Sequence, residues 1–165
     1  MSHKIDIIRR KILSGPELDC WLAQARFKNH KIVFTNGCFD VLHRGHVDYL
    51  VRASELGDLL VIGLNTDESV KRLKGPSRPY LDEETRAYIL ASMCFTSAII
   101  LFEEDTPLEL IQKVRPDVLV KGSDYKPVEI VGHDLVTSWG GKVQTIDLTP
   151  GFSSTQVIGK LTDKR

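Results

Sequence analysis

Two histidines three residues apart, His43 and His46, follow a loop that contains Gly37 and Asp40 and stand where a helix is expected to begin. An imidazole donates one hydrogen bond when neutral and two when protonated. The free backbone N–H groups of a helix start attract anions, and Gly45 lets a ligand approach the backbone closely. The sequence therefore predicts a phosphate-binding corner in which both histidines face the same anion.

A basic loop lies further along the chain, with Lys74 and Arg78 on either side of Gly75 and Pro76. Cationic side chains stabilise the negative charge that spreads over the oxygens in phosphoryl-group transfer. A loop that brings Lys74 in after binding would also exclude water. The alternative for a run of charges is a solvated face, and the loop position leaves Lys74 and Arg78 as candidates for a functional role.

Two later segments carry groups that suit a nucleotide. In 121–125, Gly122 permits close approach of a ribose or base and Asp124 can accept hydrogen bonds, although a turn with an Asx cap is the alternative. In 152–155, hydroxyls and backbone N–H groups form a second possible anion site. Simple N-capping is the alternative there, and both roles can hold at once.

Other chemistries are ranked lower. By residue type, a metal ion could be bound by Cys38, Asp40, His43 and His46. This interpretation is ranked lower because the two histidines lie on either side of a helix N-terminus and the sequence contains no second cluster of metal ligands. A nucleophilic Cys38 is conceivable, yet a small residue lining the loop is favoured. The chain has no GxGxxG, no Walker loop and no nucleophile elbow, which disfavours dehydrogenases, P-loop kinases and serine hydrolases.

Apolar runs and helical patterns alternate along the chain. Strands are predicted at 31–34, 59–64, 98–102, 117–120 and 142–146, and helices at 16–27, 45–56, 66–73, 82–93, 107–114, 129–139 and 155–161. This alternation predicts an α/β fold, a Rossmann-like, doubly wound parallel five-stranded sheet in a three-layer α/β/α arrangement. Such sheets bind ligands outside the carboxyl ends of their strands. Residues 1–30 are predicted to be an N-terminal helical extension and 31–165 the catalytic domain.

The amino-acid composition limits which binding partners and which cellular location are expected. The 165 residues carry 22 Lys and Arg against 22 Asp and Glu, so no global basic field is available for nucleic acid. No apolar run is long enough to cross a bilayer, and the N-terminus lacks the apolar core of a signal peptide. The three widely spaced cysteines indicate reduced thiols, and the expectation is a cytoplasmic protein.

The pattern Asn36-Gly37-x-Phe39-Asp40-x-x-His43-x-Gly45-His46 resembles the HxGH signature of the nucleotidyltransferase superfamily, which includes cytidylyl-, adenylyl- and pantetheine-phosphate transferases. From about Lys31 to Leu161 the chain is most similar to the D-glycero-β-D-manno-heptose 1-phosphate adenylyltransferases, the nucleotidyl half of the bifunctional enzyme for ADP-heptose. Four blocks carry this resemblance: 35–40 with the two histidines, 71–75 with Arg78-Pro79, 120–125, and 151–155.

The resemblance implies a nucleotidyltransferase domain at 31–165 that joins AMP from ATP to a sugar 1-phosphate, a lipopolysaccharide precursor, and releases pyrophosphate. It implies Mg²⁺ bound through the phosphates without a direct protein ligand, a homodimer, and a separate sugar kinase upstream. The implied catalytic residues are His43, His46 and Lys74, and Asp40, Lys74 and Arg78 are implied to contact the sugar phosphate. The implied nucleotide contacts are Asn36, Gly37, Cys38, Phe39, His43, Gly45, His46, Lys121, Gly122, Asp124, Ser153, Ser154 and Thr155.

Three rival functions remain open. Related glycerol-phosphate cytidylyltransferases carry an arginine-threonine pair before the last glycine, where this chain reads Leu148-Thr149-Pro150-Gly151. The missing arginine favours ATP over a CTP-dependent enzyme acting on glycerol 3-phosphate or a similar alcohol phosphate. The others are a non-catalytic nucleotide sensor, disfavoured by the intact histidines and Lys74, and an interaction domain that uses the helix of Trp21.

Overall fold

Five parallel strands form the centre of the computed structural model, which describes residues 3–152, 154 and 158–159. They are β1 (Ile32–Gly37), β2 (Leu59–Asn65), β3 (Ala98–Phe102), β4 (Val118–Gly122) and β5 (Lys142–Ile146), in the order β3-β2-β1-β4-β5. Every pairing between neighbouring strands is parallel. The predicted doubly wound sheet is therefore confirmed.

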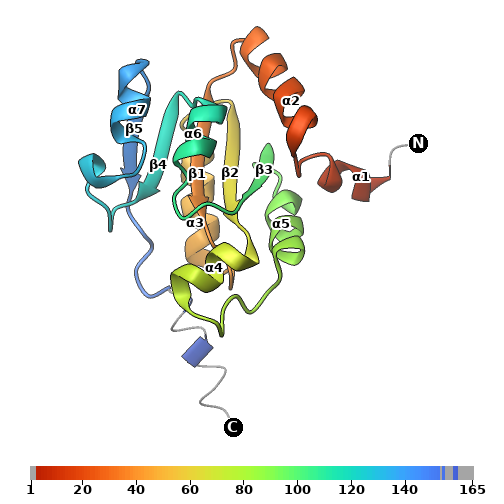
Figure 1. Ribbon diagram of the computed structural model, residues 1–165, viewed down its shortest axis with the longest axis vertical. Helices are drawn as coiled ribbons and strands as arrows, with labels where there is room; N and C mark the ends of the chain where they lie inside the picture. The colour runs from red at the N-terminus through yellow and green to blue at the C-terminus, as the bar shows by residue number, and fades with distance from the viewer. Residues whose placement is uncertain (1–2, 153, 155–157, 160–165) are drawn as a thin grey trace.

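Helices cover both faces of this sheet, with α6 (Leu108–Val114) in front of it and α3 (Arg44–Ser54) behind it in Figure 1. The layer of α6 also contains α2 (Gly15–Phe27) and α7 (His133–Ser138), and the layer of α3 contains α5 (Glu83–Ser92). The remaining helical elements are α1 (Lys4–Arg9), α4 (Asp67–Lys74) and a 3₁₀ turn, Pro127–Glu129. The three layers agree with the predicted α/β/α arrangement.

The alternation of side chains along each strand separates the core into two parts. Phe34 of β1 packs in the cluster with α2, α6 and α7, whereas its neighbour Val33 packs in the cluster with α3 and α5. Leu119 and Val120 of β4 divide in the same way. Because successive residues of a strand point to opposite faces, strands buried on both faces are apolar at every position, which is why they could be located from sequence.

The strand order creates a crevice between β1 and β4. From β1 the chain moves outward to β2 and β3, then returns to place β4 on the other side of β1. The connections leave β1 and β4 in opposite directions at this point, and ligands of such sheets bind outside the carboxyl ends of the strands there. The residues at those ends are Asn36 and Gly37 on β1 and Lys121 and Gly122 on β4.

Most observed elements begin or end a few residues from their predicted bounds, and three helices illustrate the differences. The helix predicted at 129–139 is a 3₁₀ turn at Pro127–Glu129 and then α7, because Gly132 takes a left-handed φ of 91° and interrupts the backbone between them. The helix predicted at 45–56 begins at Arg44 with His43 as its N-cap. Of the helix predicted at 155–161, Ser154, Ile158 and Gly159 are described and are helical, whereas 155–157 and 160–161 lie outside the described residues.

The predicted boundary at residue 30 stays a prediction, but α2 contributes to the core of the sheet. Leu18, Leu22 and Ala25 of this helix are buried in the same cluster as Phe34 and Ile111. Helix burial of this kind contributes to the stability of the whole domain. Among the described residues, no helix has both the length and the apolar character needed to cross a bilayer.

We expect Leu22→Ala to lower the free energy of unfolding by about 2–4 kcal/mol, because it leaves a cavity in the cluster under α2. Leu22 is 3% exposed, whereas Phe27, at the end of the same helix, is 89% exposed. Phe27→Ala is the matched control and should change stability by less than about 0.5 kcal/mol. Urea denaturation measures both, and equal values for the two variants would mean that α2 is not part of the cooperative unit.

Candidate active site

A cavity of about 620 Å³ opens at the crevice between β1 and β4. It is lined by the carboxyl ends of both strands, the start of α3, the end of α4 and the segment that follows β5. The predicted site residues that line it are Asn36, Gly37, Cys38, Phe39, His43, Gly45, His46, Lys74, Lys121, Gly122, Asp124 and Ser154. Ser153 and Thr155, also predicted to bind nucleotide, lie outside the described residues. Segments far apart in the sequence thus meet at one cavity.

The two histidines stack on each other, with ring centroids 3.9 Å apart and an interplanar angle of 28°. His43 is the N-cap of α3 and His46 lies in its first turn, so the local helix start brings both rings together. The edge of Phe39 packs on His46, with centroids 5.5 Å apart. The Nδ1 atoms of both histidines are buried and have no hydrogen-bond partner among the described residues. Such atoms are uncommon in folded proteins and call for a ligand, a water or a catalytic role.

Burial keeps His46 uncharged. The pKa of His46 is lowered to about 4, mainly by desolvation and to a smaller extent by the charges of His43 and Lys74. Burial also lowers the pKa of His43. Both rings are therefore neutral at pH 7, when each has one N–H to donate. A polyanion bound beside them would raise both pKa values, because an opposite charge favours the protonated form.

Lys121 joins the two strands that border the cavity. Its Nζ donates a hydrogen bond to the backbone carbonyl of Asn36 at 3.0 Å, which ties the end of β4 to the end of β1. Burial lowers the pKa of Lys121 to about 8, and the carboxylate of Asp124 opposes this shift. Most Lys121 side chains are thus still protonated at pH 7, and a positive charge lies at the base of the cavity.

A side chain at either of two glycine positions in the cavity wall would press on other residues of the chain. A Cβ on Gly122 would lie 2.5 Å from Oδ1 of Asp124. A Cβ on Gly45 would lie 3.0 Å from Cβ of Phe152 and 3.1 Å from the ring of His43. A Cβ at either position would force these neighbours to shift, so both glycines allow the walls of the cavity to lie close together.

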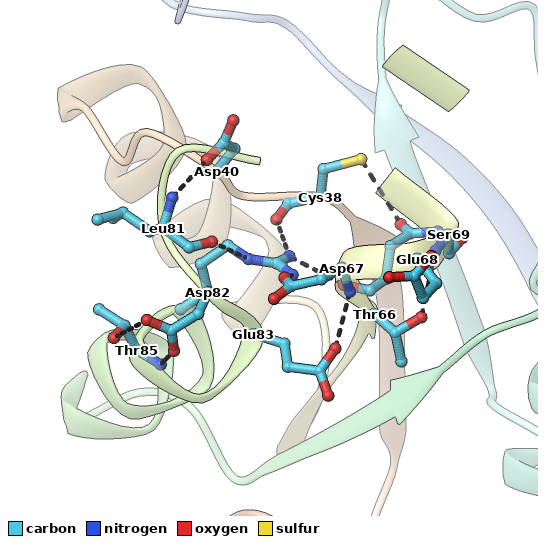
Figure 2. A network of polar contacts seen from close by, with 12 residues as sticks. Cys38, Asp40, Thr66, Asp67, Glu68, Ser69, Leu81, Asp82, Glu83 and Thr85 are labelled. Atoms are coloured by element: carbon cyan, nitrogen blue, oxygen red, sulfur yellow. Dashed lines mark hydrogen bonds and ion pairs between the residues drawn. The ribbon is translucent and has the colours of Figure 1, made fainter. Parts of the chain in front are cut away.

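Arg86 of α5 holds the polypeptide around the cavity in place, as Figure 2 shows for its hydrogen-bonding partners. Its Nη1 donates to the carbonyls of Cys38, at 2.6 Å, and Asn65, at 2.9 Å. Its Nε donates to the carbonyl of Leu81 at 2.9 Å, and its Nη2 pairs with Asp67 at 2.6 Å. The side chain is fully buried. One guanidinium thus connects the loop after β1, the end of β2, the start of α4 and the segment before α5.

Lys74 is the last residue of α4 and lies exposed at the cavity edge. The helix ends there because Gly75 takes a φ of 95°. The ammonium group of Lys74 contributes to the lowered pKa of His46, so its charge acts on the histidine pair. This arrangement brings together the three residues predicted to be catalytic.

Asp40 and Arg78 do not line the cavity; they form an ion pair with each other, Nε to Oδ2, at 2.6 Å. Oδ1 of Asp40 accepts hydrogen bonds from the backbone N–H groups of Tyr80, at 2.7 Å, and Leu81, at 3.1 Å. Their predicted contact with the sugar phosphate stays a prediction, and in the structure these polar groups make contacts within the chain.

The segment after β5 closes one side of the cavity. Leu148, Thr149, Phe152 and Ser154 line it. Thr149 Oγ1 donates to the carboxylate of Asp48 on α3 at 3.1 Å, and Ser154 Oγ donates to a backbone carbonyl at 3.3 Å. Ser154 therefore contacts the loop that precedes the histidines, and its predicted contact with the nucleotide stays a prediction.

Several residues at the site were not predicted. Tyr49 lines the cavity, and its hydroxyl lies 2.7 Å from Oγ1 of Thr35. The spacing of three residues from His46 could have indicated it, because positions i and i+3 share a helix face. Arg86 had a weaker signal, a charged residue beside the buried Ala87 and Leu90. The cavity contacts of 130–131 had no sequence signal.

The described residues contain no group of three His, Cys, Asp or Glu side chains that could hold a metal ion. Of the four ligands considered for a metal site, Asp40 is directed at Arg78 and the backbone of Tyr80. The sulfur of Cys38 lies 3.9 Å from Oδ1 of Asn65. Two of these four side chains are thus directed at partners within the chain.

Comparison with known proteins shows which family and which proteins this chain resembles. The model of the cytidylyltransferase-like family matches residues 34–160. The bifunctional protein HldE of Syntrophotalea carbinolica is 56% identical over 99% of this chain and 34% of its own length, and HldE of Trichlorobacter lovleyi is 52% identical over 93% and 31%. The chain therefore spans about a third of the length of these curated relatives.

Two solved structures are also similar. The lipopolysaccharide core biosynthesis protein from Thermoplasma volcanium has a TM-score of 0.60 and 28% identity, over 73% of this chain and 97% of that chain. Pantoate-beta-alanine ligase from Francisella tularensis has a TM-score of 0.57 and 15% identity, over 93% and 76%. The second likeness shows the fold alone.

The neutral state of His46 has a measurable consequence for stability. Its folded pKa of about 4 lies below its ordinary value of 6.5, so the unfolded chain binds more protons between these values. The stability that depends on a neutral His46 is therefore fully present above pH 6.5 and is lost as the pH falls towards 4. Between pH 7 and pH 5, the free energy of unfolding should fall by about 1–2 kcal/mol for this reason. We expect His46→Asn to remove this part of the pH dependence of the free energy of unfolding, measured by urea denaturation. An identical pH dependence in the variant would contradict a neutral His46.

Proposed function

The chain belongs to the cytidylyltransferase-like family, and from this premise we propose that it transfers AMP from ATP to a sugar 1-phosphate, with release of pyrophosphate. Heptose 1-phosphate is the proposed acceptor. The observation that carries the proposal is the stacked pair His43 and His46, with Lys74 at the same cavity beside the carboxyl ends of β1 and β4. Similarity to HldE proteins over nearly the whole chain supports adenylyl transfer over cytidylyl transfer.

The reaction needs no general base. An oxygen of the sugar phosphate, already anionic near neutral pH, attacks the α-phosphorus of ATP. The bond from that phosphorus to the oxygen bridging to the β-phosphorus breaks, and pyrophosphate leaves with its electron pair. Catalysis then consists of positioning the two phosphates and stabilising charge. Neutral His46 donates a hydrogen bond to the phosphates, and Lys74 stabilises the negative charge that shifts during transfer.

Mg²⁺ fits this site as an ion held by the triphosphate and water. The described residues offer no set of three protein ligands, while acidic side chains, Asp105 and Asp124, line the cavity. Mg²⁺ keeps several waters and commonly binds through substrate phosphates. When bound, the ion supplies neutralisation of the triphosphate charge, and the chain's own groups orient the phosphates.

Apolar side chains form the part of the cavity available to the nucleoside. Ile130, Val131 and Leu148 line it, and Leu148 stands where the related cytidylyltransferases carry an arginine. Apolar surface of this kind suits the face of a base, and a few polar groups fix its orientation. We propose that Asp124 and the backbone near Cys38 and Phe39 supply those polar contacts.

The proposed reaction indicates which other enzyme must act before this protein and where the protein is located. A kinase that phosphorylates a sugar at its anomeric carbon must supply the acceptor. The similar protein from Thermoplasma volcanium is named for lipopolysaccharide core biosynthesis, which supports a sugar acceptor. The cysteines Cys20, Cys38 and Cys94 are free, which supports a reducing, cytoplasmic location, and a homodimer is proposed from the resemblance.

We expect His46→Ala to lower kcat for pyrophosphate release by about 10²–10³, because a donor to the transition state is lost. The melting temperature should change far less, since the Nδ1 of His46 has no partner among the described residues to lose. The exposed Arg52→Ala, on the far part of α3, is the matched control and should retain activity. Wild-type turnover in His46→Ala would remove the central assignment.

We expect a pyrophosphate-release screen of four nucleotides against phosphorylated sugars and alcohols to give the highest kcat/KM for ATP with heptose 1-phosphate. We expect this result because Leu148 stands where the related cytidylyltransferases carry an arginine, and because the chain is similar to HldE. A preference for CTP with glycerol 3-phosphate would show that both the proposed nucleotide and the proposed acceptor are wrong. Binding of ATP without turnover of any acceptor would indicate a nucleotide sensor.

A further inference from the structure

Two ion pairs attach the helix of Lys74 to the loop that carries the histidines. At the start of α4, Asp67 pairs with Arg86, which also donates to the carbonyl of Cys38. Four residues beyond Lys74, Arg78 pairs with Asp40. Cys38 and Asp40 belong to the same loop after β1. The helix is thus fastened to that loop at its start and after its end.

The carboxylate of Asp40 has no free oxygen for a ligand. Asp40 uses Oδ1 for the N–H groups of Tyr80 and Leu81 and Oδ2 for Arg78. The side chain of Asp40 is 1% exposed and that of Arg78 is 15% exposed. The guanidinium of Arg78 also lies 4.7 Å from the ring centroid of Tyr80. A phosphate that took the place of Asp40 beside Nε of Arg78 would leave the buried carboxylate of Asp40 without its partner.

The backbone of Leu81 connects the two ion pairs. Its N–H donates to Asp40 and its carbonyl accepts from Arg86. Its neighbour Asp82 caps α5, where its carboxylate accepts from the N–H of Thr85 at 2.8 Å. The segment between α4 and α5 is therefore fixed at several points, and only 75–77 lie between Lys74 and its anchor.

From this closed set of contacts we propose that Asp40 and Arg78 are positioning residues, which act through Lys74 by holding it at the histidine pair, and not contacts to the sugar phosphate. The inference rests on the proposed function, in which Lys74 stabilises charge during transfer. In this proposal, Lys74 is held in place before the substrates bind and is not carried in by a mobile basic loop. Misplacing a catalytic group by about 1 Å can cost on the order of 10² in rate.

The kinetic experiment uses Arg78→Gln, Asp40→Asn and the double variant. Each single variant should lower kcat about 10–100-fold, while the KM of ATP and of the sugar phosphate changes less than about 3-fold. Because the residues act as one pair, the double variant should be no slower than the slower single variant, within about 3-fold. A tenfold rise in the KM of the sugar phosphate at unchanged kcat, or multiplying losses in the double variant, would overturn the proposal.

Two further variants separate positioning from charge and from folding. Lys71→Gln removes the same charge from the exposed face of α4, where Lys71 pairs only with Glu68 at 2.6 Å among the described contacts, and should leave kcat unchanged. Arg78→Lys keeps an ammonium group within reach of Asp40 and should recover kcat to within about 5-fold of wild type. Lysine cannot replace arginine in two-pronged phosphate binding, so a kcat for Arg78→Lys as low as that of Arg78→Gln in folded protein would contradict positioning.

A readout without turnover distinguishes failure of this inference from failure of the proposed function. The charge of Lys74 lowers the pKa of His46, so Lys74→Gln should raise that pKa in an NMR titration. Asp40→Asn should raise it too, by displacing Lys74, although loss of a carboxylate alone lowers a histidine pKa. A lowered or unchanged pKa in Asp40→Asn would overturn the positioning role, whereas absence of turnover in wild type would overturn only the proposed reaction.

Discussion

The buried guanidinium of Arg86 is the constraint on which the rest of the site depends. A charge without exposure to water is costly unless it is paired and hydrogen-bonded. Arg86 meets this requirement with Asp67 and three backbone carbonyls, from Cys38, Asn65 and Leu81. Those partners lie in four different parts of the chain, so satisfying one side chain sets the relative positions of the strand ends, α4 and the loop after β1. Separating any partner would leave a buried polar group unsatisfied.

The site built on this frame is rich in groups that favour negative charge. The neutral rings of His43 and His46, the buried ammonium of Lys121 and the exposed ammonium of Lys74 all face one cavity. Burial lowers the pKa of His46 and of Lys121 because it disfavours the charged form, although the carboxylate of Asp124 opposes the shift of Lys121. Groups held in this way are oriented before a ligand arrives, which is the condition under which electrostatic stabilisation is most effective.

The location of the cavity follows from the order of the strands. In a sheet ordered β3-β2-β1-β4-β5, β1 and β4 are neighbours although more than 80 residues of chain separate their ends, as the contact of Lys121 with Asn36 shows. The connections diverge above these two strands, so side chains at their ends are not covered by a crossing loop. The segment that carries Thr149 and Phe152 then covers the histidines from the opposite side and completes the wall.

The sequence by itself determined the class of fold and the centre of the site. Inner strands that are buried on both faces are largely apolar, and helices carry periodic apolar positions and caps, so these local signals located them. The edge strand β5 differs, because it is exposed or half-buried at every position. Residues close in sequence, such as His43, Gly45 and His46, were also assignable, because one helix start brings them together. The tertiary structure alone decided which distant groups meet. It directed Asp40 and Arg78 to each other, buried Arg86 among four segments and added 130–131 to the cavity, because such contacts depend on strand order and packing and leave no periodic pattern in the chain.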